Sequence, residues 1–297
     1  MKHQRTLKHA VYAQGIGVHS GKPVKVTLRP APSNTGIIFQ RVDLPEPVSI
    51  PALSRYVTDT AMCTTIGKDG ASISTIEHLM SALVGLQVDN VYVDIDQPEM
   101  AIMDGSSAPF VFLMESAGFV AQSALKQYIR VKKAVTVEQG DKSASLLPYD
   151  GFKVTFHIDF QHPAFKDQPS STSVEVTPEM FITDISRART FGFAKDAEKL
   201  RAMNLALGAS LDNTVVLDDT KVLNPDGLRY RDEFAKHKIL DAIGDLALLG
   251  KPLLAHFVGV KSGHAVNSLL VNALLADPDA YEIVTEDMSV QAELLTV

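Results

Sequence analysis

Cysteine is almost absent from the sequence. Of the 297 residues only Cys63 carries a thiol, which excludes a disulfide framework within the chain. A protein without disulfides is typical of a reducing compartment, so we expect a cytoplasmic location. Cys63 itself is predicted to be a small, half-buried side chain and not a metal ligand.

Long hydrophobic runs are missing as well. The basic residues near the N-terminus are not followed by an apolar stretch of signal-peptide length, and the most hydrophobic region is interrupted by Lys251 and Pro252. We therefore expect neither an export signal nor a membrane span. With 297 residues and 45 % hydrophobic content, the chain can bury a large core, which favours two globular domains.

Positive charge is in short supply. The 28 Lys and Arg residues are outnumbered by 35 Asp and Glu residues, which gives a formal net charge of −7. Binding to the phosphates of nucleic acids needs a concentrated basic surface, so a general nucleic-acid partner is excluded. An anionic small-molecule substrate would have to be bound by individual lysines. Lys238 and Lys261 are candidates, and each also fits an ordinary solvated surface charge.

Glycine-rich dinucleotide and phosphate-binding motifs are absent, which argues against a Rossmann or P-loop protein. The chain instead repeats one pattern. Residues 8–11 are echoed by residues 132–135, each opening a strand-like run, and in both halves a hairpin-like pair is followed later by a helix and a further strand. We predict an α+β fold of two domains packed on one another, residues 1–125 and 126–297.

Each predicted domain carries an insertion. Residues 45–65 interrupt the first domain, and residues 190–230 interrupt the second as a βαβ-like excursion. Within the latter, residues 200–209 are apolar and helix-prone, and residues 214–217 are rich in β-branched side chains. The excursion is either a packed structural element or an apolar groove for a lipid chain. Residues 281–297 contain no recognisable motif, and we expect a mobile tail there.

The most informative residues lie in two segments far apart. His237 and Asp241 are four residues apart in a run of helical periodicity, so both side chains leave one face of a helix. Far upstream, Glu77 and His78 stand side by side. Two imidazoles and one carboxylate are a ligand set of catalytic zinc sites, which keep the fourth position open for water. The alternative is two core helices, each with a satisfied polar histidine.

A metal held by His78, His237 and Asp241 would lower the pKa of water from about 15.7 toward roughly 7 and polarise a carbonyl. These effects favour hydrolysis of an amide or ester, with Glu77 as the general base. The motif His-Glu-x-x-His is absent from the sequence. Adjacent residues point about 100° apart on a helix, so a bend or a helix end is needed for Glu77 and His78 to reach one metal.

Hydrolysis of an amide also needs a proton donor for the leaving amine. His264, between small residues, has the residue type and the loop setting for this role. Asp245 shares a helical face with Asp241 and could orient His264, or it could simply offset the charge of Lys238. Thr190 could donate a hydrogen bond to a developing oxyanion, although taken alone it is an ordinary turn threonine.

Together these motifs resemble those of the UDP-3-O-acyl-N-acetylglucosamine deacetylases, a family that carries out the committed step of lipid A biosynthesis in Gram-negative bacteria. The resemblance spans most of the chain. The motifs that carry it are GIGVHSG at 15–21, TIEHL at 75–79, IMDGS at 102–106, SRARTFG at 186–192, HKILDAIGDL at 237–246 and SGH at 262–264.

The resemblance implies two tandem domains of like topology, with helices sandwiched between two sheets. It also implies one zinc ion per chain, and two His with one Asp suit Fe²⁺ as well. The implied roles are zinc binding for His78, His237 and Asp241, general base for Glu77, proton donor for His264, oxyanion donor for Thr190 and tuning of His264 for Asp245. The implied substrate contacts are Lys238, Lys261, Phe191, Asp159 and Phe160 near the UDP-sugar, and Leu200, Ala206 and Val216 along an acyl passage.

Two other functions stay open from the sequence. A metal amidohydrolase for another acetylated sugar would differ only at the apolar insertion. A sugar-nucleotide or lipid-binding module without catalysis would have no use for an acid and a base beside a metal, which argues against it. We expect a monomer that acts on a small-molecule substrate.

Overall fold

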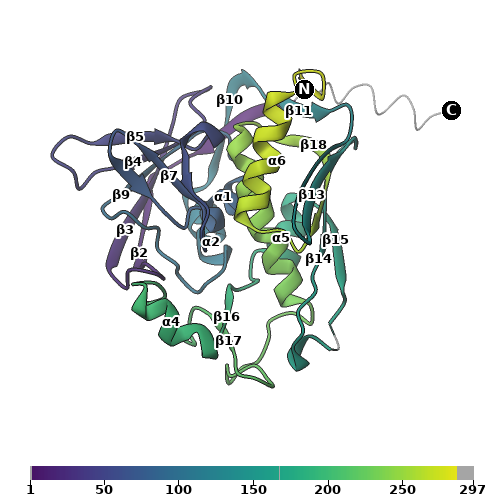
Figure 1. Ribbon diagram of the computed structural model, residues 1–297. Coiled ribbons are helices and arrows are strands. Elements are labelled where there is room, and N and C mark those ends of the chain that lie inside the picture. Colours follow the sequence, from purple (N-terminus) through teal and green to yellow (C-terminus); the bar gives the residue numbers. More distant parts are fainter. Residues whose placement is uncertain (1, 167, 286–297) are drawn as a thin grey trace.

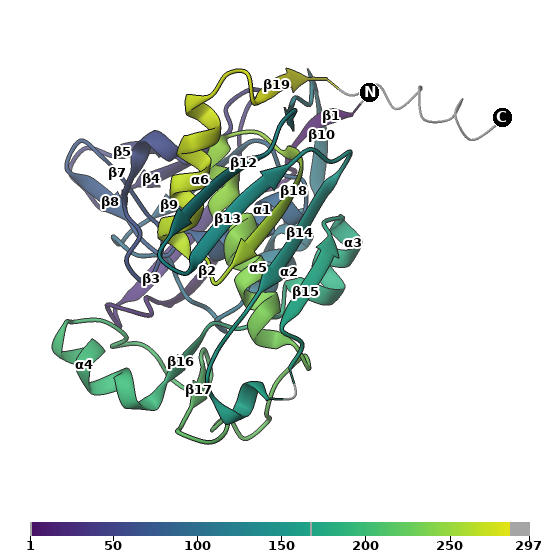
Figure 2. The same ribbon diagram turned by 45° about the vertical axis from the view of Figure 1, so that its right-hand side comes forward.

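Two β-sheets form the outer layers of the molecule, and four helices fill the space between them (Figures 1 and 2). The computed structural model describes residues 2–166 and 168–285. Within these residues no helix is long and apolar enough to cross a membrane. The inner helices are α1 (Glu77–Gly85), α2 (Ala108–Ala117), α5 (Glu233–Leu246) and α6 (His264–Ala276).

The two sheets repeat one topology. The first has the order β2-β3-β9-β4-β5, and the second contains the order β12-β13-β18-β14-β15. Along both orders the successive pairings are antiparallel, antiparallel, parallel and antiparallel. The predicted α+β fold with two like halves and helices between two sheets is thereby confirmed. The strands are β2 (Val11–Ile16), β3 (Pro23–Pro30), β4 (Ile37–Arg41), β5 (Val48–Pro51) and β9 (Val91–Ile95), and β12 (Val135–Gln139), β13 (Lys142–Leu147), β14 (Phe152–His157), β15 (Ser171–Glu175) and β18 (Leu253–Val260).

The remaining elements extend these sheets or connect them. Strand β1 (His3–Leu7) pairs with β10 (Phe119–Leu125), β11 (Tyr128–Val131) joins the second sheet beside β18, and β6 (Val57–Asp59), β7 (Thr65–Lys68) and β8 (Ala71–Ile73) form a small sheet. Val48–Pro51, inside the range predicted as an insertion, forms the edge strand β5. The short helices are η1 (Ser54–Tyr56), η2 (Pro163–Phe165), α3 (Pro178–Met180), η3 (Phe181–Ile185), η4 (Ala194–Asp196) and η5 (Ala247–Leu249).

The segment after residue 190 is a strand, a helix and a second strand. Strands β16 (Phe191–Phe193) and β17 (Val215–Leu217) pair in parallel, and α4 (Ala197–Ala202) lies between them in sequence. The helix is shorter than the apolar run at 200–209 suggests. Asn204 has a positive φ of 57°, Leu205 N–H bonds to Leu200 O and Asn204 N–H bonds to Arg201 O, which is the pattern of a Schellman helix end.

The last described residues belong to the second sheet. Strand β19 (Tyr281–Val284) pairs antiparallel with β11, so the expectation of a mobile tail is wrong for these four residues. Backbone hydrogen bonds to β11 hold them in place. The rest of that expected tail, residues 286–297, lies outside the described residues.

Helices α1 and α5 pack against each other at the centre of the molecule. Leu79 and Leu83 of α1 and Ile239 and Ile243 of α5 are completely buried. Gly244 allows the close approach, because a Cβ at this position would lie 2.1 Å from the carbonyl oxygen of Glu77. A buried polar side chain without a hydrogen-bond partner costs free energy, so the polar residues of the buried helix α5 must each have a partner.

Gly244→Ala is expected to force α1 and α5 apart. Alanine is intrinsically the better helix former, so a loss of stability would report the steric overlap alone. We expect the melting temperature to fall by roughly 5–10 °C, which is what overpacking of a core typically costs. Gly192→Ala is the matched control, because a Cβ there meets no atom within 4 Å. Equal melting temperatures of the two variants would contradict the close-approach argument.

Candidate active site

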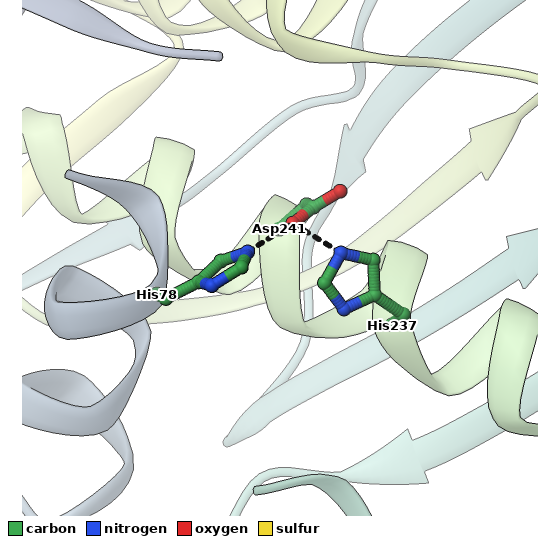
Figure 3. Close-up of side chains that lie close together, drawn as sticks. All are labelled: His78, His237 and Asp241. Atoms are coloured by element: carbon green, nitrogen blue, oxygen red, sulfur yellow. Dashed lines mark ion pairs between the residues drawn. The ribbon is translucent and has the colours of Figure 1, made fainter. Parts of the chain in front are cut away.

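Three of the predicted residues form a compact buried cluster. His78 from α1 and His237 and Asp241 from α5 point toward one another (Figure 3). Asp241 Oδ1 lies 3.3 Å from His237 Nε2 and 3.7 Å from His78 Nε2, and one ligand atom of each residue falls within 4.8 Å of the others. Bonds of 2.0–2.2 Å to a tetrahedral ion place ligand atoms about 3.4 Å apart, so the cluster fits a metal such as zinc.

The protonation states also suit a metal site. Burial lowers the pKa of His78 to about 3 and lowers that of His237, which keeps both imidazoles neutral. Burial alone would raise the pKa of Asp241, but His237 and Lys238 hold it below its ordinary value. His237 Nδ1 donates to Ala188 O at 3.1 Å, which fixes the tautomer and leaves Nε2 as an acceptor for a cation.

A helix end resolves the angular problem of neighbouring Glu77 and His78. Helix α1 begins at Glu77, and Thr75 just before it has a positive φ of 60°. Glu77 is therefore in the first turn of α1, close enough to Asp241 for the charge of Asp241 to help raise its pKa. Glu77 Oε1 lies 3.9 Å from Nε2 of His264, the first residue of α6.

Glu77 and His264 have pKa values that differ in the way an acid and base pair requires. Burial raises the pKa of Glu77 to about 7, with Asp241 and Asp245 adding to the effect and His264 opposing it. Burial lowers the pKa of His264, but the charge and hydrogen bond of Asp245 outweigh it and raise the pKa to about 9. Near neutral pH His264 is protonated, and Glu77 can exchange a proton.

Asp245 is hydrogen-bonded to His264, and Lys238 is hydrogen-bonded to Asp241. His264 Nδ1 donates to Asp245 Oδ2 at 2.9 Å. The ammonium group of Lys238 instead donates to Asp241 Oδ2, so Lys238 is tied to the cluster and is not a freely solvated surface charge. Asp245 therefore orients His264 through a hydrogen bond, and its charge also helps to raise the pKa of Lys238, so both interpretations of Asp245 keep support.

Thr190 and Phe191 come shortly after Ala188, whose carbonyl accepts the hydrogen bond from His237. Thr190 N–H donates to Gly105 O at 2.8 Å, two residues after the carbonyl of Ala188 that accepts from His237. The Phe191 ring packs edge-on against the imidazole of His237, with ring centroids 6.1 Å apart. Both residues therefore lie next to the cluster.

Phe160, Asp159 and Lys261 lie further out. The ring of Phe160 contacts that of Phe191, with centroids 5.6 Å apart. Lys261 forms an ion pair with Asp159 at 2.7 Å and another with Asp141 at 3.2 Å. Hydrogen bonds to Asp159 and Asp141 raise the pKa of Lys261, and a substrate phosphate would compete with these carboxylates for its charge.

The three residues proposed for an acyl passage occupy different parts of the insertion. Val216 on β17 pairs with Gly192 on β16, next to Phe191. Ala206 lies in the loop after α4, where its N–H approaches Nδ1 of His19 at 3.4 Å. Leu200 belongs to α4, a helix at the edge of the molecule (Figure 2). Exposed apolar side chains occur in the same segment, among them Met203, Leu207 and Leu211.

Sequence reasoning missed several residues that shape the site. Ala188 orients His237 through its backbone carbonyl, which no side-chain pattern can reveal. The segment of Ala188 is held by a buried ion pair between Arg189 and Glu233, 2.8 Å apart. Glu99 accepts hydrogen bonds from the N–H groups of His19 and Ser20 and so braces the loop that contacts the insertion. In the sequence, only the motifs at 15–21 and 186–192 indicated that these segments belong to the site.

Cys63 and a cavity between the two halves lie outside the cluster. Burial raises the pKa of Cys63 to about 12, so its thiol stays protonated, and it is not among the clustered residues. A cavity of about 620 Å³ lies between the halves near Val84 and Ala247, and none of the predicted site residues lines it. The chemistry is located by the titratable cluster and not by the size of the cavity.

A buried cluster of two histidines and one aspartate, with a carboxylate and an imidazole beside it, is the arrangement of metal-dependent hydrolases. The family model of UDP-3-O-acyl N-acetylglycosamine deacetylase matches residues 4–276, and the chain belongs to this family. The expected family resemblance is confirmed.

Proteins named UDP-3-O-acyl-N-acetylglucosamine deacetylase are similar over nearly their whole length. The protein from Marinobacter nauticus is 55% identical over 287 residues, which is 97% of this chain and 94% of that protein. The protein from Chromohalobacter salexigens is 55% identical over 96% of this chain and 94% of its own length. The protein from Coxiella burnetii is 55% identical over 95% of this chain and 93% of its own length.

Proposed function

We propose that this protein hydrolyses the N-acetyl group of UDP-3-O-acyl-N-acetylglucosamine to give acetate and UDP-3-O-acyl-glucosamine, a step of lipid A biosynthesis. The observation that carries the proposal is the pair of Glu77 and His264, 3.9 Å apart and both close enough to Asp241 of the cluster for its charge to raise their pKa values. The family membership and the relatives of the same name support this substrate. We further propose that the protein acts as a monomer in the cytoplasm.

One metal ion is proposed to bind His78, His237 and Asp241, and zinc is the ion that this donor set suits first, with Fe²⁺ as the alternative. A bound ion would supply a Lewis acid that polarises the acetyl carbonyl and lowers the pKa of water. The two neutral imidazoles and the ionised carboxylate provide the ligand states that such an ion needs. Lys238 neutralises part of the charge of Asp241 and would lie close to the substrate.

Glu77 and His264 divide the proton transfers between them. Glu77 takes a proton from the attacking water, and His264 donates one to the departing glucosamine nitrogen as the C–N bond breaks. Asp245 holds the imidazole of His264 in the tautomer with a proton on Nδ1 and stabilises its charged form. We propose that Thr190 donates a hydrogen bond to the developing oxyanion.

The proposed substrate contacts involve the residues further from the cluster. The rings of Phe191 and Phe160 contact each other, and Phe191 also contacts His237. We propose that the sugar part of the substrate packs on these two rings. Lys261, next to Asp159, would contact the nucleotide end. The acyl chain would run along the insertion, past Leu200, Ala206 and Val216.

The pH dependence of activity is expected to be bell-shaped. Glu77 must be ionised to accept a proton, so the rate rises with pH at or below about 7, since a bound cation would lower the pKa of its carboxyl. His264 must be protonated to donate, so the rate falls as pH rises through about 9 or below, since the same cation would lower the pKa of His264. Measurement of kcat/KM across both limbs checks this profile. An alkaline limb that persists in His264→Gln would contradict the role of His264.

The deciding experiment is acetate release from UDP-3-O-acyl-N-acetylglucosamine by metal-stripped protein, before and after one equivalent of zinc. We expect activity only after zinc is added. Equal activity on the substrate without its acyl chain would favour an amidohydrolase for another acetylated sugar. Tight binding without turnover would favour a binding module.

A further inference from the structure

Thr64 connects the two groups on either side of the proposed reaction. Its side chain is 2% exposed, and it comes from the loop before β7 in the first half of the chain. The backbone N–H of Thr64 donates to Glu77 Oε2 at 3.1 Å, and its hydroxyl donates to Asp245 Oδ1 at 2.6 Å. One residue thus bonds both the proposed base and the partner of the proposed acid.

The Asp245 carboxylate is held by donors on both oxygens. Oδ2 accepts from His264 Nδ1 at 2.9 Å and from Asn267 Nδ2 at 2.8 Å, both on α6. Oδ1 accepts from the hydroxyl of Thr64. Hydrogen bonds to a charged, buried acceptor are strong, so this set of donors fixes the rotation of the carboxylate and the plane in which His264 lies.

Thr64 is itself well anchored. Its carbonyl accepts a hydrogen bond from the N–H of Ile76, the residue before α1, at 3.4 Å. Its N–H and its carbonyl are therefore both tied to the start of the helix that carries Glu77 and His78. The hydroxyl of Thr64 projects from this fixed backbone to a carboxylate on α5, 181 residues later in the sequence.

We propose that Thr64 is a positioning residue, whose hydroxyl holds Asp245, and through it His264, at a fixed distance from Glu77. This inference rests on the proposed function, and no part of that function by itself requires Thr64. The hydroxyl is the group that matters. The void lined by Thr64, Asp245 and His264 has no room for a water molecule that could replace a missing donor.

Thr64→Val tests the proposal, because valine keeps the shape of threonine and removes the donor. We expect kcat to fall roughly 10-fold, as is typical when an outer partner of a catalytic group is lost, with KM and metal content unchanged. Thr64→Ser keeps the hydroxyl and should retain kcat within about 3-fold. Thr65→Val is the matched control. In the described part of the chain, the hydroxyl of Thr65 has a hydrogen bond only with the sulfur of Cys63. The Thr58 hydroxyl donates to the backbone carbonyl of Thr65, which the substitution leaves in place.

A double-mutant cycle locates the effect. If Thr64 acts through His264, Thr64→Val should cost nothing further in a His264→Ala background. An undiminished loss in that background would overturn the proposal. So would full kcat in Thr64→Val, or an equal loss in Thr64→Ser, which would assign the effect to packing of the methyl group.

A readout independent of turnover is the NMR resonance of the His264 Nδ1 proton, assigned by its loss in His264→Ala. We expect this resonance to shift or broaden in Thr64→Val and to persist unchanged in Thr64→Ser at equal melting temperature. An unchanged resonance in Thr64→Val would reject the positioning role. Zinc-loaded parent protein that releases no acetate, but shows the expected resonance changes, would refute the proposed function and leave the positioning role supported.

Discussion

His237→Ala is expected to remove both the metal and the activity of this protein. His237 and Asp241 lie one helical turn apart on α5, and their atoms are 3.3 Å apart, so the loss of one imidazole leaves two ligands from different helices. A metal that supplies several kcal/mol of transition-state stabilisation is lost with it, and kcat/KM should fall by more than about 10³-fold. Metal content after dialysis and the rate of acetate release measure the two losses.

His9→Ala is the matched control for this variant. His9 is exposed and lies before β2, far from the cluster in sequence. It should keep one metal ion per chain and full activity. If His237→Ala kept its metal and its rate, the ligand assignment for this helix would be wrong, and the histidine would be a buried polar residue satisfied by Ala188 alone.

Glu77→Gln is expected to keep the metal and lose the rate. Glu77 lies 3.9 Å from His264, and Gln retains an oxygen that can accept from the N–H of Thr64, so the fold of this region should persist. Gln cannot accept a proton from water, and general base catalysis typically contributes about 10²–10⁴-fold. We expect kcat to fall by that factor while KM and metal content stay constant.

Glu115→Gln, at an exposed position of α2, controls for the change of charge. Its kcat should equal that of the parent protein. A Glu77→Gln variant that retained full kcat would exclude Glu77 as the base. Loss of the metal in Glu77→Gln would instead make Glu77 a metal ligand and would require a different base.

Helices and strands could be predicted where the hydrophobic periodicity of neighbouring residues is clear. The helix and the further strand that were expected in each half are found as α1 with β9 and as α5 with β18. The end of α4 was not predicted, because the left-handed turn at Asn204 overrides the apolar run that continues beyond it. Strand β19 was missed since its pairing with β11 joins segments 150 residues apart, which no local pattern encodes.

The residues of the site could be predicted from the sequence, but some of the contacts between them could not. The pairing of His237 with Asp241 follows from the spacing of four residues on a helix, and the family motifs supplied the other proposed roles. The ion pair of Lys238 with Asp241 also has helical spacing, three residues apart on α5, and the contact of Asp245 with His264 was expected. The bridge through Thr64 had no signal in spacing, because it joins a loop of the first half to α5, and short polar side chains such as Thr64 look alike wherever they occur.

The α+β class, the repeated order of strands and helices and the ligand types can be inferred from the amino-acid sequence, because hydrophobic period and helical spacing are properties of neighbouring residues. The close approach of α1 to α5 at Gly244, which brings His78 to His237, arises only when the chain folds. Folding also sets the protonation states. The pKa values of Glu77 and His264 depend on burial and on charges from distant segments, and these exist only once the chain is folded.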